Sequence, residues 1–174
     1  MTQTIGGSFG AKVATPGLGF PYNNLLWRYN FGKPHCPGFL LPRSEIFTDM
    51  APTIVVEDGT VIAALGAPGS TRIPSFIATV VSNLVDSKME LAQAVAAPRT
   101  LFGGTYSTHA SVEILDPITE ADADAIEAMG YTEVERYRYP PRSAGIVTFG
   151  GVNVIAFDPH ESSWVGVGDG RRWG

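Results

Sequence analysis

The chain has 174 residues, a length that fits one domain with a substantial core. Its composition, 44% hydrophobic and 17% charged with 20 Gly and 13 Pro, is typical of a turn-rich protein that mixes helices and strands. A net charge of −5, without a cluster of Lys and Arg, argues against a nucleic-acid partner.

The sequence also argues against a membrane partner, because no apolar run reaches the roughly 18 residues that a span requires. Residues 1–10 have neither a basic nor an apolar region, so we expect no signal peptide in this chain and take the cytoplasm as the default location. The single cysteine, Cys36, excludes an internal disulfide. Together with His35 it makes no metal-ligand set, so we expect a plain loop thiol and no cofactor or metal.

In chain order, residues 2–19 are rich in Gly and Thr and predict a short strand followed by an irregular loop. Residues 29–49 contain three prolines and predict a long surface loop, a feature that is often functional. Two apolar runs, 53–57 and 60–65, flank Asp58-Gly59, which is a strong signal for a hairpin with a type I′ turn. Because these runs are nearly all apolar, we expect both faces of their sheet to be covered.

Three helices are expected next. The first has apolar residues at spacings of three and four between 73 and 85, and Pro74 places its start near residues 70–73. The second starts at Ser87 with Glu90 in a capping box and stops before Pro98. The third runs from a Thr119 cap to Gly130.

Residues 131–174 are expected to form strands, with Gly150-Gly151 joining 146–149 and 152–155 in a hairpin. The pattern predicts an α+β fold, a layered sandwich with helices on one face of a sheet.

The most informative motif is the Gly-rich turn 66–72, Gly-Ala-Pro-Gly-Ser-Thr-Arg, between a buried strand and a long helix. Backbone N–H groups at a helix start have no intrahelical partner and lie at the positive end of the helix dipole. Such a turn suits an anion or a developing oxyanion. An ordinary strand-to-helix turn that uses Gly for tightness is the alternative.

Several sequence blocks match motifs of one known family, in the same order and with the same spacing. They are Thr-Gln-Thr-Ile at 2–5, Phe-Gly at 9–10, Asn-Asn at 23–24, Met-Ala-Pro-Thr-Ile at 50–54, the turn 66–73, Ala-Pro-Arg at 97–99 and the stretch 166–171. The chain is similar to the C-terminal part of the small subunit of γ-glutamyltranspeptidases, which are N-terminal-nucleophile hydrolases. The resemblance covers residues 1–174 as one domain and implies a partial αββα sandwich.

The resemblance also implies an amide hydrolase or acyltransferase. In the family, a Thr at a new N-terminus attacks an amide carbonyl, with its own α-amine as general base. Gly69 and Ser70 match the two oxyanion-hole positions, with Ser70 in place of a second Gly. Thr4 matches a Thr whose hydroxyl supports the nucleophile.

The positions that match the family's substrate-binding residues have changed. Thr48 and Asp49 match two Ser residues that bind the donor carboxylate. Gly6 matches a substrate-contacting Asn, while Leu25 and Arg28 match the Gln and Asp that hold the glutamyl α-amine. Arg28 against an ammonium and Asp49 against a carboxylate are like-charge clashes. We therefore expect a donor without an α-amine, unless residues 10–29 are aligned in a different register.

In this alignment the nucleophile precedes the matched region, so we expect a partner polypeptide that carries it, of the large-subunit type or another. If Met1 were removed, Thr2 could stand in as the nucleophile. Unpaired strands would leave Ile54, Val56 and Ile62 exposed.

Two alternatives stay open. One is a non-catalytic scaffolding subunit; the other is a family member that acts on a β-lactam side chain or a biosynthetic intermediate. His109 and His160 mark no catalytic triad, and Asp122 and Asp124 are expected to be solvated surface.

Overall fold

The computed structural model describes residues 1–7, 9–32, 34–103, 111–114, 119–131, 133–136 and 150–171. The chain separates into two compact units, Met1–Met50 and Ala51–Gly174, which we call the N-terminal and C-terminal units. The expectation of one domain over residues 1–174 stays a prediction.

The N-terminal unit is built mostly from turns. Its one described helix is the 3₁₀ turn η1 (Leu25–Arg28), and isolated bridges join Ala14 to Pro21 and Asn30 to Phe39. The strand expected near residues 2–5 is absent from the described segment 1–7. The Ile5 carbonyl instead accepts a hydrogen bond from the Asn24 N–H (3.1 Å), so this segment pairs with a turn rather than with a strand.

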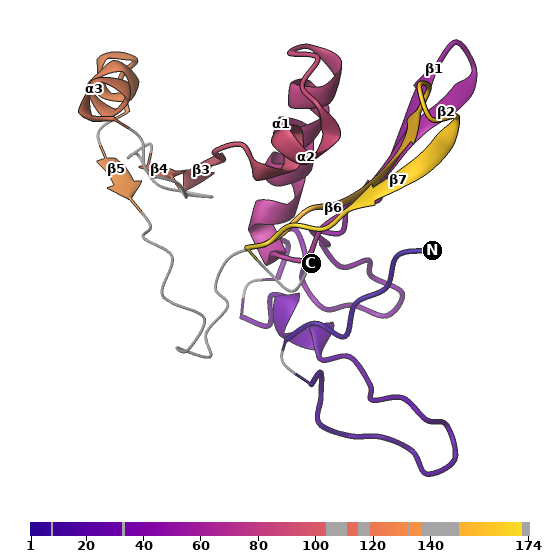
Figure 1. Ribbon diagram of the computed structural model, residues 1–174. Helices are drawn as coiled ribbons and strands as arrows, with labels where there is room; N and C mark the ends of the chain where they lie inside the picture. Colours follow the sequence, from indigo (N-terminus) through magenta and orange to yellow (C-terminus); the bar gives the residue numbers. More distant parts are fainter. Residues whose placement is uncertain are drawn as a thin grey trace. The chain divides into compact units, whose positions relative to one another are not determined.

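The C-terminal unit contains a four-stranded antiparallel sheet in the order β1-β2-β6-β7 (Figure 1). The strands are β1 (Thr53–Glu57), β2 (Thr60–Gly66), β6 (Asn153–Asp158) and β7 (Ser163–Val167). Asp58 and Gly59 have φ values of 49° and 79° in the turn between β1 and β2, which confirms the predicted hairpin. A register shift lies between Val55 and Val56.

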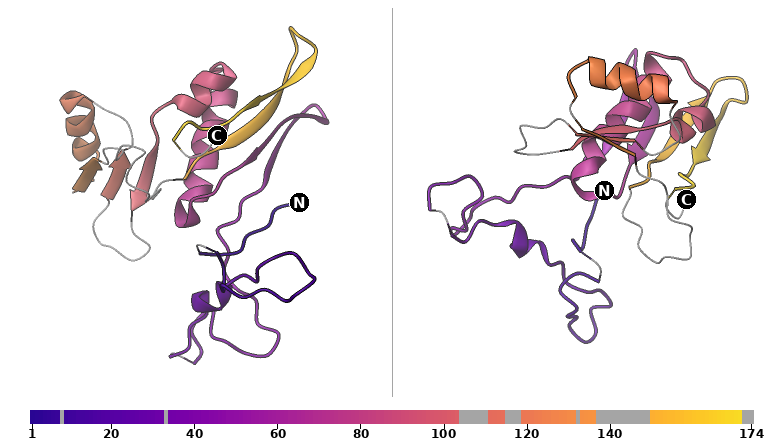
Figure 2. Two further views of the ribbon diagram at one scale, coloured as in Figure 1. Left: turned by 60° about the horizontal axis from the view of Figure 1, so that its bottom comes forward. Right: turned by 90° about the vertical axis from the view of Figure 1, so that its left-hand side faces the viewer.

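Helices α1 (Ile73–Val85) and α2 (Leu91–Ala96) cover one face of this sheet (Figure 2). The core between these helices and the sheet contains seven buried residues: Ala63, Leu65, Phe76, Val80, Val95, Val152 and Val154. The start of α1, with Pro74 in its first turn, is as predicted. The predicted start of α2 at Ser87 is wrong, because Glu90 is the N-cap residue and makes no side-chain cap.

Strand β6 is the central strand that joins the two hairpins. It is hydrogen-bonded to β2 on one side and to β7 on the other. Its hairpin partner is therefore β7, through the turn at 159–162, and both its edges are occupied. The predicted partner segment 146–149 lies outside the described residues.

A second sheet has the order β3-β4-β5, from β3 (Thr100–Gly103), β4 (Ser111–Ile114) and β5 (Glu133–Arg136), with helix α3 (Glu120–Ala128) before β5. Thr119 caps α3 as predicted, and the Asp122 side chain accepts from the Thr119 N–H in return. None of the helices in the described part of the chain has the length and apolar character needed to cross a bilayer.

The face of the four-stranded sheet opposite the helices is apolar and exposed, which corrects the expectation that both faces are covered. The strand pairing places Ile54, Ile155, Phe157 and Trp164 on that face, where they are 64%, 44%, 41% and 49% exposed. Phe157 and Trp164 pack edge to face, with ring centroids 5.6 Å apart. The predicted exposure of Ile54 and Val56 is confirmed, whereas Ile62 is half-buried.

Candidate active site

The Gly-rich turn lies between β2 and α1, as expected. Gly69 has a φ of 146° and Ser70 a φ of 55°, and a 3₁₀ turn, η2 (Ser70–Arg72), leads into α1. Both residues therefore use backbone conformations that favour glycine, and Ser70 adopts one with a side chain. Successive backbone N–H groups in a tight turn can form a concave site for an anion.

The turn packs directly against Gly150, which precedes β6. A Cβ added to Gly69 would lie 2.9 Å from the Gly150 Cα. A Cβ added to Gly150 would lie 3.0 Å from the Gly69 Cα and still closer to the Pro68 carbonyl oxygen. Two backbones thus meet at a distance that only glycine allows, and this contact fixes where the turn lies.

A buried ion pair lies beside this contact. Arg99 is 0% exposed and donates to the Asp169 carboxylate, which is 2% exposed and also accepts from the Val152 N–H (3.1 Å). The Arg99 guanidinium lies over the Phe76 ring, 5.2 Å from its centroid. Arg171 donates to the Val95 carbonyl at the end of α2 (2.9 Å) and to Asp169 (3.4 Å). These contacts tie the end of the chain to α2 and to the segment that enters β6.

In the N-terminal unit, Thr4 and Gly6 lie in one turn. The Thr4 hydroxyl accepts from the Gly6 N–H (3.0 Å). Gly6 has a φ of 85°, and the Asn24 side chain occupies the space that a Cβ at Gly6 would need. The Asn24 amide oxygen accepts from the Gly7 N–H (2.8 Å). A side chain at position 6 would therefore displace Asn24, which explains the glycine at that position.

Arg28 and Asp49 form an ion pair, so the structure brings together two of the predicted site residues. The Arg28 guanidinium donates to Asp49, and the two side chains are 16% and 20% exposed. Arg28 also lies over the Trp27 ring, 4.8 Å from its centroid. Leu25 begins the same 3₁₀ turn. The Thr48 hydroxyl accepts from the Met50 N–H (3.1 Å), and this leaves its own hydrogen for a further acceptor.

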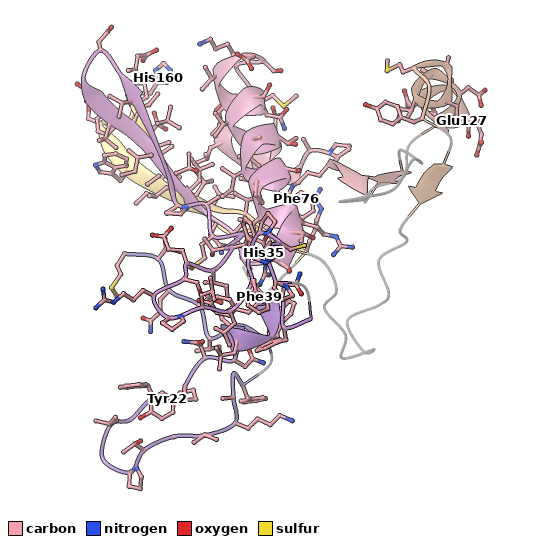
Figure 3. The ribbon with its side chains drawn as sticks, turned by 180° about the vertical axis from the view of Figure 1, so that it is seen from behind. Tyr22, His35, Phe39, Phe76, Glu127 and His160 are labelled. Atoms are coloured by element: carbon pink, nitrogen blue, oxygen red, sulfur yellow. The ribbon has the colours of Figure 1, made fainter. Side chains whose placement is uncertain are left out.

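The remaining polar candidates form no catalytic cluster in the described part of the chain. His160 lies at the tip of the β6–β7 hairpin, well away from Phe76 on α1 (Figure 3). His109 lies outside the described residues. Cys36 is exposed, as expected for a loop thiol. No group of three or more His, Cys, Asp or Glu suitable for a metal ion occurs in the ranges that the structure describes.

Gly150 and Asp169 lie at the candidate site but were not predicted from the sequence. The Gly150-Gly151 pair was interpreted as a hairpin turn, because periodicity carries no information on which distant backbone a glycine contacts. Asp169 belongs to a stretch, 166–171, that resembles the family but has no charged partner nearby in sequence. Arg99, its partner, is 70 residues away.

The sheet covered by helices on one face and the Gly-rich turn before α1 give the α+β fold of the N-terminal-nucleophile hydrolases. The model of the family "Gamma-glutamyltranspeptidase" matches residues 1–174, so the chain belongs to the γ-glutamyltranspeptidase family. Over its full length the chain superimposes on an acivicin-inhibited gamma-glutamyltranspeptidase with a TM-score of 0.80 and 26% identity, and it covers 92% of that chain.

Two curated relatives differ in how similar they are to this chain. The Acylase ACY 1 proenzyme of Pseudomonas sp. (strain V22) is 43% identical over 162 residues, 91% of this chain and 26% of that protein. The Glutathione hydrolase proenzyme of Pseudomonas aeruginosa is 29% identical over 140 residues, 75% of this chain and 25% of that protein. The chain thus spans about a quarter of the length of these proenzymes.

Proposed function

We propose that this chain is the oxyanion-stabilising part of an amide hydrolase or acyltransferase whose acyl donor carries no α-ammonium group. The observation that carries the proposal is the Arg28–Asp49 ion pair. By resemblance, position 28 is where the family places a carboxylate against the donor's ammonium, and position 49 is where it places a hydroxyl against the donor's carboxylate. Here these positions hold opposite charges that neutralise each other.

The ion pair disfavours an ordinary γ-glutamyl donor on electrostatic grounds. Such a donor presents an ammonium and a carboxylate on one carbon, and its ammonium would meet a guanidinium, a contact that costs several kcal/mol. The Asp49 carboxylate is already compensated by Arg28 and offers little net attraction to a second cation. A donor that carries a carboxylate but no ammonium, such as a glutaryl amide, avoids this like-charge contact with Arg28.

The similarity to an acylase also favours a donor without an α-ammonium group. Identity to the Acylase ACY 1 proenzyme is 43%, against 29% for the Glutathione hydrolase proenzyme of Pseudomonas aeruginosa. The family resemblance alone leaves the donor open between a glutamyl compound and another acyl group, whereas this difference in identity favours another acyl group.

The proposed chemistry is acyl transfer through a nucleophilic Thr, which in the family precedes the residues matched here. The Thr oxygen forms a bond to the amide carbonyl carbon, and the carbonyl oxygen becomes an oxyanion that accepts from the N–H groups of Gly69 and Ser70. The C–N bond then breaks, and the proton taken from the Thr hydroxyl passes through its α-amine to the leaving amine. Water or an amine acceptor releases the acyl group.

We also propose that the apolar sheet face packs against a second polypeptide of the large-subunit type. Ile54, Phe157 and Trp164 are 64%, 41% and 49% exposed on one face of the sheet, and exposed apolar patches of this kind mark interfaces. The chain should therefore be inactive on its own. A monodisperse preparation of residues 1–174 that cleaves amides without any partner would contradict this part of the proposal.

The experiment that tests the enzymatic role uses an electrophile that captures an N-terminal Thr. The assembled protein is treated with the reagent, and the labelled peptide is identified by mass spectrometry. Stoichiometric labelling that abolishes amide cleavage is expected. An assembled protein that takes up no label and cleaves neither a glutaryl nor a γ-glutamyl anilide would be a scaffolding subunit, contrary to the proposal.

A further inference from the structure

We infer that Gly150 is a positioning residue for the oxyanion turn, acting through the backbone of Pro68 and Gly69. This inference rests on the proposed function, because it assigns Gly150 the task of holding the two N–H donors of Gly69 and Ser70 in place. Gly150 touches no reacting atom itself. It comes from the segment that enters β6, 81 residues after Gly69 in the sequence.

The contact between the two segments is made by backbone alone. The Gly150 backbone lies so close to Pro68 and Gly69 that an added Cβ would be 3.0 Å from the Gly69 Cα, 3.2 Å from the Phe76 ring and nearer still to the Pro68 carbonyl oxygen. Real Cβ atoms essentially never come within 3.0 Å of such atoms. Because the nearest of these atoms belong to backbone, an added methyl can be relieved only by movement of the turn.

Gly150 is itself held in place by buried groups on its other side. Two residues on, the Val152 N–H donates to Asp169 (3.1 Å), and Asp169 is paired with the fully buried Arg99. Val152 is 0% exposed and belongs to the core with Phe76. The segment 150–152 is thus fixed by an ion pair and by packing, so a clash at Gly150 displaces the turn rather than the segment.

The requirement for glycine at this position is one of space and not of backbone angle. Gly150 has no φ in the left-handed region, so alanine can adopt its backbone conformation without strain. The substitution Gly150→Ala therefore tests the contact with the smallest possible change. Gly166 in β7 offers a matched control, because it also has no left-handed φ and its Cβ would meet nothing within 4 Å.

The displacement should affect the transition state more than the ground state. Oxyanion donors act at distances of 2.7–3.1 Å, so a shift of a few tenths of an ångström weakens them. Loss of one such donor lowers kcat by about 10²–10³-fold. Donor binding, which the proposed function assigns to other residues, should change little. A residue that served stability alone would not separate kcat from KM in this way.

The test compares wild-type, Gly150→Ala and Gly166→Ala proteins as assembled enzymes. The substrate is the anilide, glutaryl or γ-glutamyl, that the wild type cleaves faster. Rates are expressed per active site, counted with the Thr-directed electrophile. We expect kcat to fall about 10²–10³-fold in Gly150→Ala with KM within about threefold, and no change in Gly166→Ala. The inhibition constant of 4-boronobutanoate, which forms a tetrahedral adduct, should rise in parallel, while that of glutarate stays constant.

Three outcomes would overturn the inference. The first is wild-type kcat in Gly150→Ala, which would leave the proposed function intact. The second is a Gly150→Ala protein that fails to assemble although Gly166→Ala assembles, which would make Gly150 a purely structural residue. The third is a wild-type enzyme that cleaves neither anilide, in which case the proposed function fails and no oxyanion exists to be positioned.

Discussion

Arg28 and Asp49, 21 residues apart in the sequence, are partners in one largely buried ion pair. Taken separately, each residue opposes one end of a glutamyl donor. As a pair they leave no uncompensated carboxylate for a donor ammonium, because Asp49 is already bound by Arg28, and the ammonium would meet the Arg28 guanidinium instead. This relationship is the basis for the donor specificity proposed above.

Replacing Arg28 with Asp should shift the donor preference toward γ-glutamyl compounds. The substitution places two carboxylates side by side, and one of them should acquire a raised pKa because like charges disfavour ionisation. An ammonium relieves that repulsion, so the ratio of kcat/KM for γ-glutamyl over glutaryl anilide should rise at least about tenfold, and more at pH 8 than at pH 6. Arg28→Gln is the control, since it should lose the glutaryl rate without gaining γ-glutamyl activity. An unchanged ratio in Arg28→Asp would contradict the assignment.

Replacing Gly69 with Val should lower kcat by about 10²–10³-fold, the typical effect of losing one oxyanion donor. The structure adds a second reason, because a Cβ at this position meets the Gly150 Cα at 2.9 Å and the φ of 146° is strained for any residue with a side chain. Steady-state kinetics on the assembled enzyme measure the effect. Unchanged turnover would remove Gly69 from the oxyanion site.

Replacing Ser70 with Gly should stabilise the protein while keeping it active. Ser70 has a φ of 55°, a conformation that costs a residue with a side chain about 1–2 kcal/mol. Glycine adopts it freely but loses more entropy on folding, so we expect a net gain of about 0.5–1 kcal/mol and a rise in Tm of a few degrees. Differential scanning calorimetry checks the gain, and kcat should stay within about twofold. A lower Tm would show that the Ser70 side chain contributes more than its backbone costs.

Helix α3 should lose its N-terminal cap in acid. The hydrogen bonds that Asp122 accepts from the side chain and the backbone of Thr119 lower the pKa of Asp122 below its usual 3.8. A lowered pKa in the folded state means that the stabilisation is present above the unfolded pKa and is lost as pH falls through the folded value. The protection of α3 amides against exchange, measured relative to the intrinsic rate at each pH, should therefore fall below about pH 4 in the wild type. Asp122→Asn should flatten this pH dependence, whereas Asp124→Asn, a control that removes a charge without touching the cap, should not. The same profile in all three proteins would rule out the capping role.

The parts of the fold with strong local signals were predictable from the sequence. The Asp58-Gly59 hairpin and the start of α1 at Pro74 follow from backbone preferences that act within a few residues. The start of α2 was wrong, because Ser87 and Glu90 have capping-box spacing but the chain reaches helical geometry only at Leu91. Asp122 is solvent-exposed, as expected, and it also closes the cap with Thr119, which was not foreseen.

The long-range contacts of the candidate site could not be predicted in the same way. Arg99 and Asp169 are 70 residues apart, and no periodicity links them. The approach of Gly150 to Gly69 depends on the packing of β6 against the turn before α1, which tertiary structure alone decides. The family resemblance made Gly69 and Ser70 candidates for the oxyanion site, which stays a prediction, and it gave no indication that Arg28 and Asp49 would pair.

The most direct test of the proposed donor class is a comparison of two chromogenic substrates on the assembled enzyme. Glutaryl anilide and γ-glutamyl anilide differ only in the α-amine, so the ratio of their kcat/KM values isolates the contribution of that group. Because the amine would lie against Arg28, we expect the glutaryl compound to be the better donor, by about tenfold or more. If the γ-glutamyl anilide is cleaved with the higher kcat/KM, the Arg28–Asp49 pair does not select against the amine, and the proposed donor class is wrong.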